Sequence, residues 1–241
     1  MKKLAMITGA SKGLGKALSL YFAKEGYNLA ICSRTEETIQ EVKKEAVELG
    51  ADVLALGADM STAKDVERFV ALTEEYYGKI DVLINNASIL GPSPMPFLLD
   101  YPEHDFEEVL RVNTIGPFLV TRRVLPIMLQ KQTGSIINIT SEAGATGYAG
   151  WGAYGISKFA LEGLTETWAD EVRESGVRVN MVDPGEMDTE MHRLAVPDCD
   201  YELARPEDIT AVFGFLASDA SSHITGQRFE AQEFQLEGSG N

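Results

Sequence analysis

The sequence predicts an α/β fold in which a doubly wound parallel sheet of about seven strands is flanked by helices on both faces. Short apolar runs of strand length alternate with amphipathic helical patterns along most of the chain. A glycine-rich turn stands at the first junction between a strand and a helix. The chain has 241 residues. Since no linker divides it, residues 1–234 are expected to form a single domain, and the polar tail 235–241 is expected to be disordered.

The first half of the sheet is predicted from apolar runs that are bounded by glycine or polar residues. The patterns between these runs predict helices, and one of them stops at Gly50, a residue type that commonly ends helices. The predicted strands are 4–8, 28–33, 53–56 and 81–84, and the predicted helices are 16–24, 36–49 and 62–77.

The second half continues the same alternation after a proline-rich loop, 91–96, which either lines a pocket or serves as a rigid connector. A long helical region then contains Pro126, which is expected to bend it or to lie near its end. The predicted elements are the helical region 105–131, strand 135–139, helix 151–175, strand 177–182, a short amphipathic helix 187–197, helix 206–217 and a final short strand that begins at 224.

Composition excludes several classes of function. The formal net charge of −16 argues against nucleic acid and anionic membrane surfaces as partners. No apolar run is long enough for a transmembrane helix. Two cysteines and three histidines are scattered along the chain, so neither a disulfide scaffold nor a metal site is expected. With no signal peptide predicted, we expect a cytoplasmic protein.

The glycine-rich turn has the chemistry of a phosphate-binding loop. It runs Thr8-Gly-Ala-Ser-Lys-Gly-Leu-Gly15, between a predicted strand and a predicted helix. Glycines allow the backbone to approach a pyrophosphate, and the helix N-terminus offers free N–H groups. The spacing Gly-x-x-x-Gly-x-Gly differs from the common Gly-x-Gly-x-x-Gly, so the turn alone is also compatible with a simple structural role. Its position predicts a Rossmann-like dinucleotide site.

The end of the second predicted strand indicates which dinucleotide is bound. Enzymes that use NAD usually place Asp or Glu there to bind the ribose 2′-hydroxyl. Here the strand ends in Ser33 and Arg34, and Lys12 lies in the glycine loop. Two cations and a hydroxyl suit a 2′-phosphate, which favours NADP(H). The alternative is that Arg34 is only a solvated loop residue.

Tyr154 and Lys158 are candidates for proton transfer. Residues four apart share one helix face, so the phenol and the ammonium are expected to be neighbours. A nearby cation favours the phenolate and lowers the pKa of a tyrosine. Such pairs also occur on solvated helices without function, so the assignment depends on the rest of the site. Two further polar candidates are Asn113, inside an apolar helix face, and Ser141, at a strand end. Each could equally be structural.

Taken together, these stretches resemble the short-chain dehydrogenase/reductase family over roughly residues 3 to 230. The resemblance rests on the glycine loop, Asn85-Asn-Ala87, Asn113, Ser141, the Tyr154-x-x-x-Lys158 step, Pro184-Gly185 and Thr189, all in the family's order and spacing. It implies that Tyr154 is the general acid or base, that Lys158 binds the nicotinamide ribose and lowers the pKa of Tyr154, that Ser141 holds the substrate oxygen and that Asn113 holds a relay water.

The resemblance also implies a set of cofactor-binding residues. Asp59 would meet the adenine, Asn86 and Ala87 would lie along the cofactor, and Thr189 with the backbone after Pro184 would hold the carboxamide. The full predicted set is Gly9, Ser11, Lys12, Gly13, Leu14, Gly15, Ser33, Arg34, Asp59, Met60, Asn86, Ala87, Tyr154, Lys158, Pro184, Gly185 and Thr189.

Three departures from the family pattern stand out. Ser88 replaces the usual glycine after Asn-Asn-Ala, and Asp183 replaces the usual asparagine before Pro-Gly. The chain also ends in Phe229 to Phe234 rather than in an apolar-Asp-Gly-Gly strand. This last difference leaves the pocket and the subunit contacts near the C-terminus open.

The resulting functional hypothesis is an NADPH-dependent carbonyl reductase or alcohol dehydrogenase acting on a small molecule. A 3-oxoacyl-carrier-protein reductase is an alternative, although an acidic carrier suits a chain of net charge −16 poorly. A catalytically silent NADP-binding sensor or scaffold is a third. By family analogy, helices 105–131 and 152–175 would form a homodimer or homotetramer. The expected pocket residues are Ile89, Leu90, Met95, Glu142, Tyr148, Trp151, Met187 and His192.

Overall fold

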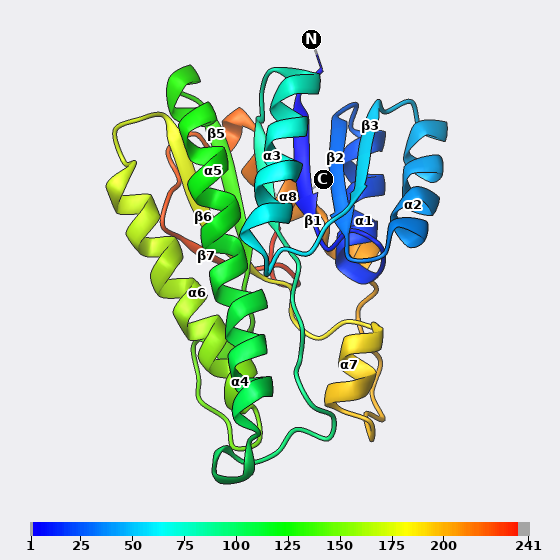
Figure 1. The fold of residues 1–241 in the computed structure, drawn as a ribbon, viewed down its shortest axis with the longest axis vertical. Helices are drawn as coiled ribbons and strands as arrows, with labels where there is room; N and C mark the ends of the chain where they lie inside the picture. Colours follow the sequence, from blue (N-terminus) through cyan, green and yellow to red (C-terminus); the bar gives the residue numbers. More distant parts are fainter. Residues whose placement is uncertain (1, 236–241) are drawn as a thin grey trace.

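Seven parallel strands form one sheet in the computed structural model, which describes residues 2–235 (Figure 1). The strands lie in the order β3-β2-β1-β4-β5-β6-β7, and every pairing between neighbours is parallel. This confirms the predicted α/β fold. The strands are β1 (Leu4–Thr8), β2 (Asn28–Ser33), β3 (Val53–Gly57), β4 (Val82–Asn85), β5 (Gly134–Ile139), β6 (Val177–Asp183) and β7 (Arg228–Glu230).

Helices cover both faces of this sheet. One face packs against α1, α2 and α8, and the other packs against α3, α5 and α6, which lie in front of the sheet in Figure 1. The helices are α1 (Gly13–Lys24), α2 (Glu36–Glu48), α3 (Ala63–Tyr77), α4 (Glu103–Leu110), α5 (Gly116–Lys131), α6 (Gly152–Glu171), α7 (Glu190–Ala195) and α8 (Ala211–Ala217).

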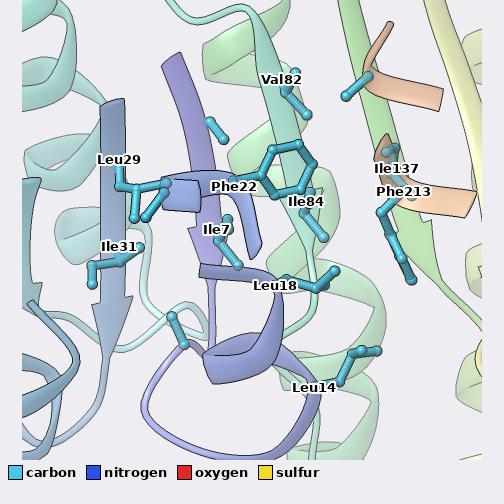
Figure 2. Packing of buried hydrophobic residues seen from close by; sticks show 14 of the residues in the cluster. Ile7, Leu14, Leu18, Phe22, Leu29, Ile31, Val82, Ile84, Ile137 and Phe213 are labelled. Carbon is cyan, nitrogen blue, oxygen red and sulfur yellow. The ribbon is translucent and has the colours of Figure 1, made fainter. Parts of the chain in front are cut away.

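Alternation along the strands explains why both faces are apolar. Ala5 and Ile7 of β1 point to the side of α1, whereas Leu4 and Met6 point to the side of α3 and α5. A strand that is buried on both faces therefore reads as a continuous apolar run. Figure 2 shows the first of these cores, with Phe22 of α1 fully buried against strand side chains.

The predicted helical region 105–131 is continuous but not uniform. A π-helical turn, Arg111–Ile115, joins α4 to α5, and Asn113 lies in its centre. Pro117 lies where the π turn passes into α5, and Pro126 lies inside the helix. The π turn shifts the register of the helix, which turns the amide of Asn113 toward the loop after β4.

The final strand is shorter than the sequence indicates. Residues 224–227 run beside β6 without forming a regular strand: the side chain of Asn180 bonds to the carbonyl of Ile224 and to the amide of Gln227, and two backbone bonds link Gly226 and Gln227 to β6. The strand itself begins at Arg228. The tail predicted to be disordered lies outside the described residues from 236 onward, and the boundary placed at 234 stays a prediction.

The order of the strands reverses between β1 and β4. The chain moves outward from β1 to β2 and β3, then returns to β4 on the other side of β1. Open α/β sheets bind ligands outside the carboxyl ends of their strands at such a reversal. Helices α4 and α7 extend beyond this edge (Figure 1). Within residues 2–235, no helix combines the length and the apolar character that crossing a membrane requires.

Candidate active site

A cleft of about 1180 Å³ opens at the carboxyl edge of the sheet. Its lining includes all of the residues that the sequence predicts for cofactor binding, from the glycine loop to Thr189. Ser141, Tyr154 and Lys158 line the same cleft, whereas Asn113 does not. The structure therefore brings three of the four predicted catalytic residues together with the predicted cofactor residues.

The glycine loop has no room for side chains at two positions. A Cβ at Gly15 would lie 2.2 Å from the carbonyl oxygen of Gly9, and a Cβ at Gly9 would lie 2.7 Å from the Cα of Ala87. Gly9 also has a φ of 65°, which favours glycine. The side-chain amide of Asn86 holds the loop by donating to the carbonyls of Thr8 and Gly9. No side chain caps the N-terminus of α1. The free N–H groups of its first turn are therefore available to bind an anion in the cleft.

The end of β2 presents a cation without a carboxylate partner. Arg34 is exposed and makes no ion pair within residues 2–235. The hydroxyl of Ser33 donates to the carbonyl of Thr35. The next carboxylate along the chain, Glu36, accepts bonds from the amide of Gly57 and from Gln40, so it is already engaged. This edge of the cleft suits a phosphate better than a ribose hydroxyl.

Lys12 does not point freely into the cleft. Its ammonium pairs with the carboxylate of Glu190, the first residue of α7. The glycine loop and the helix α7 are therefore linked across the cleft by an exposed ion pair, and they are 178 positions apart in sequence. A role for Lys12 toward a 2′-phosphate requires this pair to open or to be shared.

Tyr154 and Lys158 lie on the same face of α6, as predicted. The Nζ of Lys158 is 5.3 Å from the centroid of the Tyr154 ring and donates to the carbonyl of Ile139 at 2.9 Å. Burial is the main cause that raises the pKa of Tyr154 to about 12, with a hydrogen bond from Ser141 lowering it and Asp183 raising it. Burial likewise lowers the pKa of Lys158 to about 8, against the opposing effect of Asp183 and Glu162.

The direction of this shift corrects one expectation. The sequence suggests that Lys158 lowers the pKa of the phenol, whereas in the structure desolvation raises this pKa and the hydrogen bond with Ser141 is what lowers it. The phenol is therefore protonated at neutral pH, which is the form that donates a proton to a carbonyl oxygen.

Ser141 is the second residue after β5 and caps the start of a short 3-10 turn, Glu142–Gly144. Its Oγ accepts a bond from the amide of Ala143 at 3.3 Å. The segment is thus fixed at both ends, since Thr140 donates its amide to the carbonyl of Val182 on the neighbouring strand. A hydroxyl held this way beside Tyr154 is suited to binding a substrate oxygen.

Asn113 has a structural partner for each of its amide groups. Its Oδ1 accepts from the amide of Ile89, and its Nδ2 donates to the carbonyl of Ile89 and to the hydroxyl of Ser157. These bonds connect the π turn, the loop after β4 and α6, next to Tyr154 and Lys158. The relay water that the family resemblance implies stays a prediction.

The substrate end of the cleft has aromatic and apolar walls. The ring of Trp151 lies 5.8 Å from that of Tyr154, centroid to centroid. Met95 packs against the cluster around Leu90 and Tyr154 but does not line the cleft. The other predicted pocket residues line it, namely Ile89, Leu90, Glu142, Tyr148, Trp151, Met187 and His192.

The charged residues at or beneath the cleft that the sequence did not point to as functional include Glu162, Glu190 and Arg228. Glu162 is four positions after Lys158 on the same helix face, so its spacing was a usable signal. Glu190 and Arg228 gave no such signal, because their partners are far away in sequence.

Comparison with known proteins places the site in context. A family model described as short chain dehydrogenase matches residues 3–200. The chain is 36% identical over 235 residues to a 3-oxoacyl-[acyl-carrier-protein] reductase of Thermotoga maritima, covering 93% of this chain and 94% of that protein.

Two solved structures have the same fold. A short-chain dehydrogenase from Escherichia coli CFT073 in complex with NADPH aligns with a TM-score of 0.89 and 31% identity, covering 95% of this chain and 96% of the other. An NAD+-bound xylitol dehydrogenase aligns with a TM-score of 0.86 and 29% identity, covering 95% and 96%. The matching model, the relatives and the fold agree with the residues at the cleft, and the chain belongs to the short-chain dehydrogenase family of oxidoreductases.

Proposed function

We propose that this protein is an NADPH-dependent reductase that converts a ketone or aldehyde to an alcohol, or catalyses the reverse reaction. The observation that carries the proposal is the convergence of a protonated, buried phenol, a buried lysine and a serine hydroxyl at one end of a long cleft. The other end of the same cleft is built from a glycine loop and a helix N-terminus.

The residues at the cleft fit NADP(H). The uncapped start of α1 and the crowded glycines at positions 9 and 15 form a cradle that a pyrophosphate can approach closely. The exposed guanidinium of Arg34, beside Ser33, would pair with a 2′-phosphate, and the next carboxylate along the chain, Glu36, is bound to Gln40 and Gly57 and does not line the cleft. The NADPH complex of a structural neighbour supports this choice, while the NAD+ complex of another shows that the fold accepts either dinucleotide.

The roles of the side chains follow from their positions. When bound, the nicotinamide supplies or accepts the hydride. In carbonyl reduction, Tyr154 donates the phenolic proton to the substrate oxygen, and the hydroxyl of Ser141 donates a hydrogen bond to the same oxygen. Lys158 stabilises the phenolate that results, because its ammonium lies beside the ring. Asn113 holds α6 and the loop after β4 in register, and it is proposed to hold the water that returns the proton from solvent.

A second candidate is the reduction of a 3-oxoacyl group carried on an acyl carrier protein. The relative of that activity in Thermotoga maritima, at 36% identity over nearly the whole chain, favours it. The net charge of −16 opposes it, because carrier proteins are acidic and a negatively charged enzyme repels them at long range. Small carbonyl compounds do not meet this barrier.

The test is an absorbance assay with purified protein. NADPH and NADH are offered in parallel with ketones, aldehydes, diketones, a 3-oxoacyl thioester of a short thiol and the same acyl group on a carrier protein. The proposal expects consumption of NADPH well ahead of NADH with a free carbonyl compound. Turnover only of the carrier-bound substrate would select the second candidate. Tight binding of NADPH without turnover of any compound in the panel would favour the catalytically silent NADP-binding sensor.

The proposal includes the assembly and the location. Apolar side chains on α6 and the adjoining π turn are exposed, among them Ile115, Ile156 and Phe159 at 40%, 40% and 45%. A homodimer or homotetramer that buries these helices explains why they are apolar. Cys32 and Cys199 are free thiols, which suits a reducing compartment such as the cytoplasm.

A further inference from the structure

Arg228 connects four segments of the active site from its place on β7. Its guanidinium donates to the carboxylate of Asp183 at 2.7 Å, to the carboxylate of Glu162 at 3.1 Å and to the carbonyl of Ser141 at 3.2 Å. It also pairs with Glu230 on its own strand. The side chains of Asp183 and Glu162 are only 5% and 14% exposed, and that of Arg228 is 24% exposed. Asp183, Glu162 and Arg228 therefore lie beneath the cleft, whereas the side chain of Glu230 is 42% exposed.

The cluster holds the segment that presents Ser141. Three consecutive residues of this segment are each bound by a different charged side chain. Lys158 binds the carbonyl of Ile139, Glu162 accepts the hydroxyl of Thr140 at 2.6 Å, and Arg228 binds the carbonyl of Ser141. The fit is close, because a Cβ at Gly144 would lie 2.7 Å from the Glu162 carboxylate and 3.1 Å from the Lys158 Cβ. If the guanidinium of Arg228 moved, the carbonyl of Ser141 that it binds would be expected to move with it.

Asp183 needs this arginine. A carboxylate that is nearly inaccessible to water is costly unless it is paired and hydrogen-bonded. Arg228 supplies the charge, and the amide of Gly185 donates to the other carboxylate oxygen at 2.9 Å. Asp183 is one of the positions at which the sequence departs from the family pattern, and the arginine that pairs with it directly precedes the departure near the C-terminus, Phe229 to Phe234.

We infer that Asp183 and Arg228 are a pair of positioning residues for the proton transfer, which fix the Ser141 segment and set the balance of charge at Tyr154 and Lys158. The inference rests on the proposed function. Ionisable groups from several elements lie around this pair: Glu162 of α6 and Glu230 of β7 both pair with Arg228. Tyr154 and Lys158 of α6 lie on the other side, and Asp183 raises the pKa values of both.

The two partners carry opposite charges, which gives opposite predictions. Asp183→Asn removes a negative charge and should lower the pKa of Tyr154, so the rate of carbonyl reduction falls at lower pH than in the parent protein. Arg228→Gln removes a positive charge and should raise the pKa of Tyr154. The decline of the rate at high pH, here called the pH limb, should therefore move to higher pH. Each shift is expected to be about half a pH unit or more. The double variant should return the limb toward its original position, because the net charge of the site is restored.

A structural role alone would not produce this pattern. Loss of packing lowers the rate and the unfolding temperature in both variants without moving the pH limb in opposite directions. Arg228→Lys separates the effect of the positive charge from that of the hydrogen bonds, since it keeps the charge and loses the planar guanidinium that binds several groups at once. It should lower kcat several-fold, leave KM for NADPH unchanged and leave the pH limb in place.

The experiment measures kcat and KM against pH for the parent, Asp183→Asn, Arg228→Gln, Arg228→Lys and the double variant, together with thermal unfolding of each. The carbonyl compound is the best substrate of the panel described above. Asp208→Asn and Arg205→Gln are matched controls, because Arg205 and Asp208 form an exposed ion pair of 2.7 Å away from the cleft. The controls should not move the pH limb.

The outcomes separate this inference from the proposed function. Opposite shifts in the two single variants, with recovery in the double variant, would support the positioning pair. Unshifted limbs or shifts of the same sign would overturn it, even with Tyr154→Phe inactive as the function requires. If Arg228→Gln does not fold, the isosteric Asp183→Asn and the charge-preserving Arg228→Lys decide the question. Full activity of Tyr154→Phe would instead reject the proposed function itself.

Discussion

The ammonium of Lys158 lies 5.3 Å from the ring centroid of Tyr154, and both side chains are buried at the base of the cleft. Burial acts on the two groups in opposite directions, raising the pKa of the phenol and lowering that of the amine. The two pKa values, about 12 and about 8, therefore leave the phenol protonated and the lysine still charged near neutral pH. This is the arrangement that favours donation of a proton to a carbonyl.

Tyr154→Phe should abolish turnover while leaving cofactor binding nearly unchanged. The substitution removes the proton donor and retains the ring, so the rate is expected to fall by about 100-fold or more. NADPH consumption measures the rate, and quenching of protein fluorescence on titration with NADPH measures binding. Tyr148→Phe, at an exposed tyrosine of the same cleft, is the control for loss of a hydroxyl. Parent-like turnover by Tyr154→Phe would remove Tyr154 from the mechanism.

Arg34→Ala should weaken NADPH binding and leave NADH binding unchanged. A charge-assisted bond to a 2′-phosphate contributes enough for an increase of about tenfold in the dissociation constant. The measurement is a titration of each dinucleotide by fluorescence or calorimetry. Arg205→Ala serves as the control at an exposed arginine outside the cleft. An equal loss for both dinucleotides would show that Arg34 does not recognise the phosphate.

Lys158→Met should stabilise the fold near neutral pH while it destroys activity. Burial lowers the pKa of Lys158 from 10.5 to about 8, so the unfolded chain binds more protons than the native state between these values. The free energy of unfolding therefore increases as the pH rises between these two pKa values. At lower pH the buried charge of Lys158 lowers the free energy of unfolding. After the lost bond to Ile139 is allowed for, the gain at about pH 7 is expected to be about 1–2 kcal/mol.

Chemical denaturation of the parent and the Lys158→Met variant at about pH 7 and about pH 9.5 tests the direction of this effect. The difference in the free energy of unfolding should narrow at the higher pH, where the native lysine is neutral. A difference that stays constant with pH would mean that the native lysine does not titrate in this range.

Phe22→Ala should cost about 3–5 kcal/mol of unfolding free energy, because it leaves a cavity in the core between α1 and the sheet. Phe22 is fully buried among strand side chains (Figure 2), and its ring packs edge-on against Tyr21 and Tyr27. Tyr76→Ala is the matched control, since this aromatic ring is 62% exposed, and its loss should cost less than about 1 kcal/mol. Equal costs at the two positions would contradict the described packing.

Phe159→Asp should dissociate the proposed oligomer. A charge in the centre of an apolar contact is costly to bury, so the variant is expected to sediment at a lower molecular mass than the parent. Leu49→Asp, at a residue of comparable exposure beyond α2, is the control and should leave the mass unchanged. If the parent itself sediments as a monomer, the proposed assembly is wrong.

The sequence alone determined the elements whose signals are local. The strands β1 and β2 were predicted at their observed bounds, because both are apolar runs that end at glycine or polar residues. The glycine loop, Ser33, Arg34 and the Tyr154-x-x-x-Lys158 step were found in the same way, and the structure gathers them at one cleft. Periodicity and glycine placement record what each stretch does within a few turns of chain.

Only the tertiary structure decided how charges from distant segments combine. Lys12 meets Glu190, and Arg228 meets Glu162 and Asp183, although these partners are separated by 178, 66 and 45 positions. The same holds for the pKa of Tyr154, which the four-residue step predicted to fall and which burial raises. Desolvation and ion pairing depend on which surfaces pack together, and a linear pattern of residue types does not contain that information.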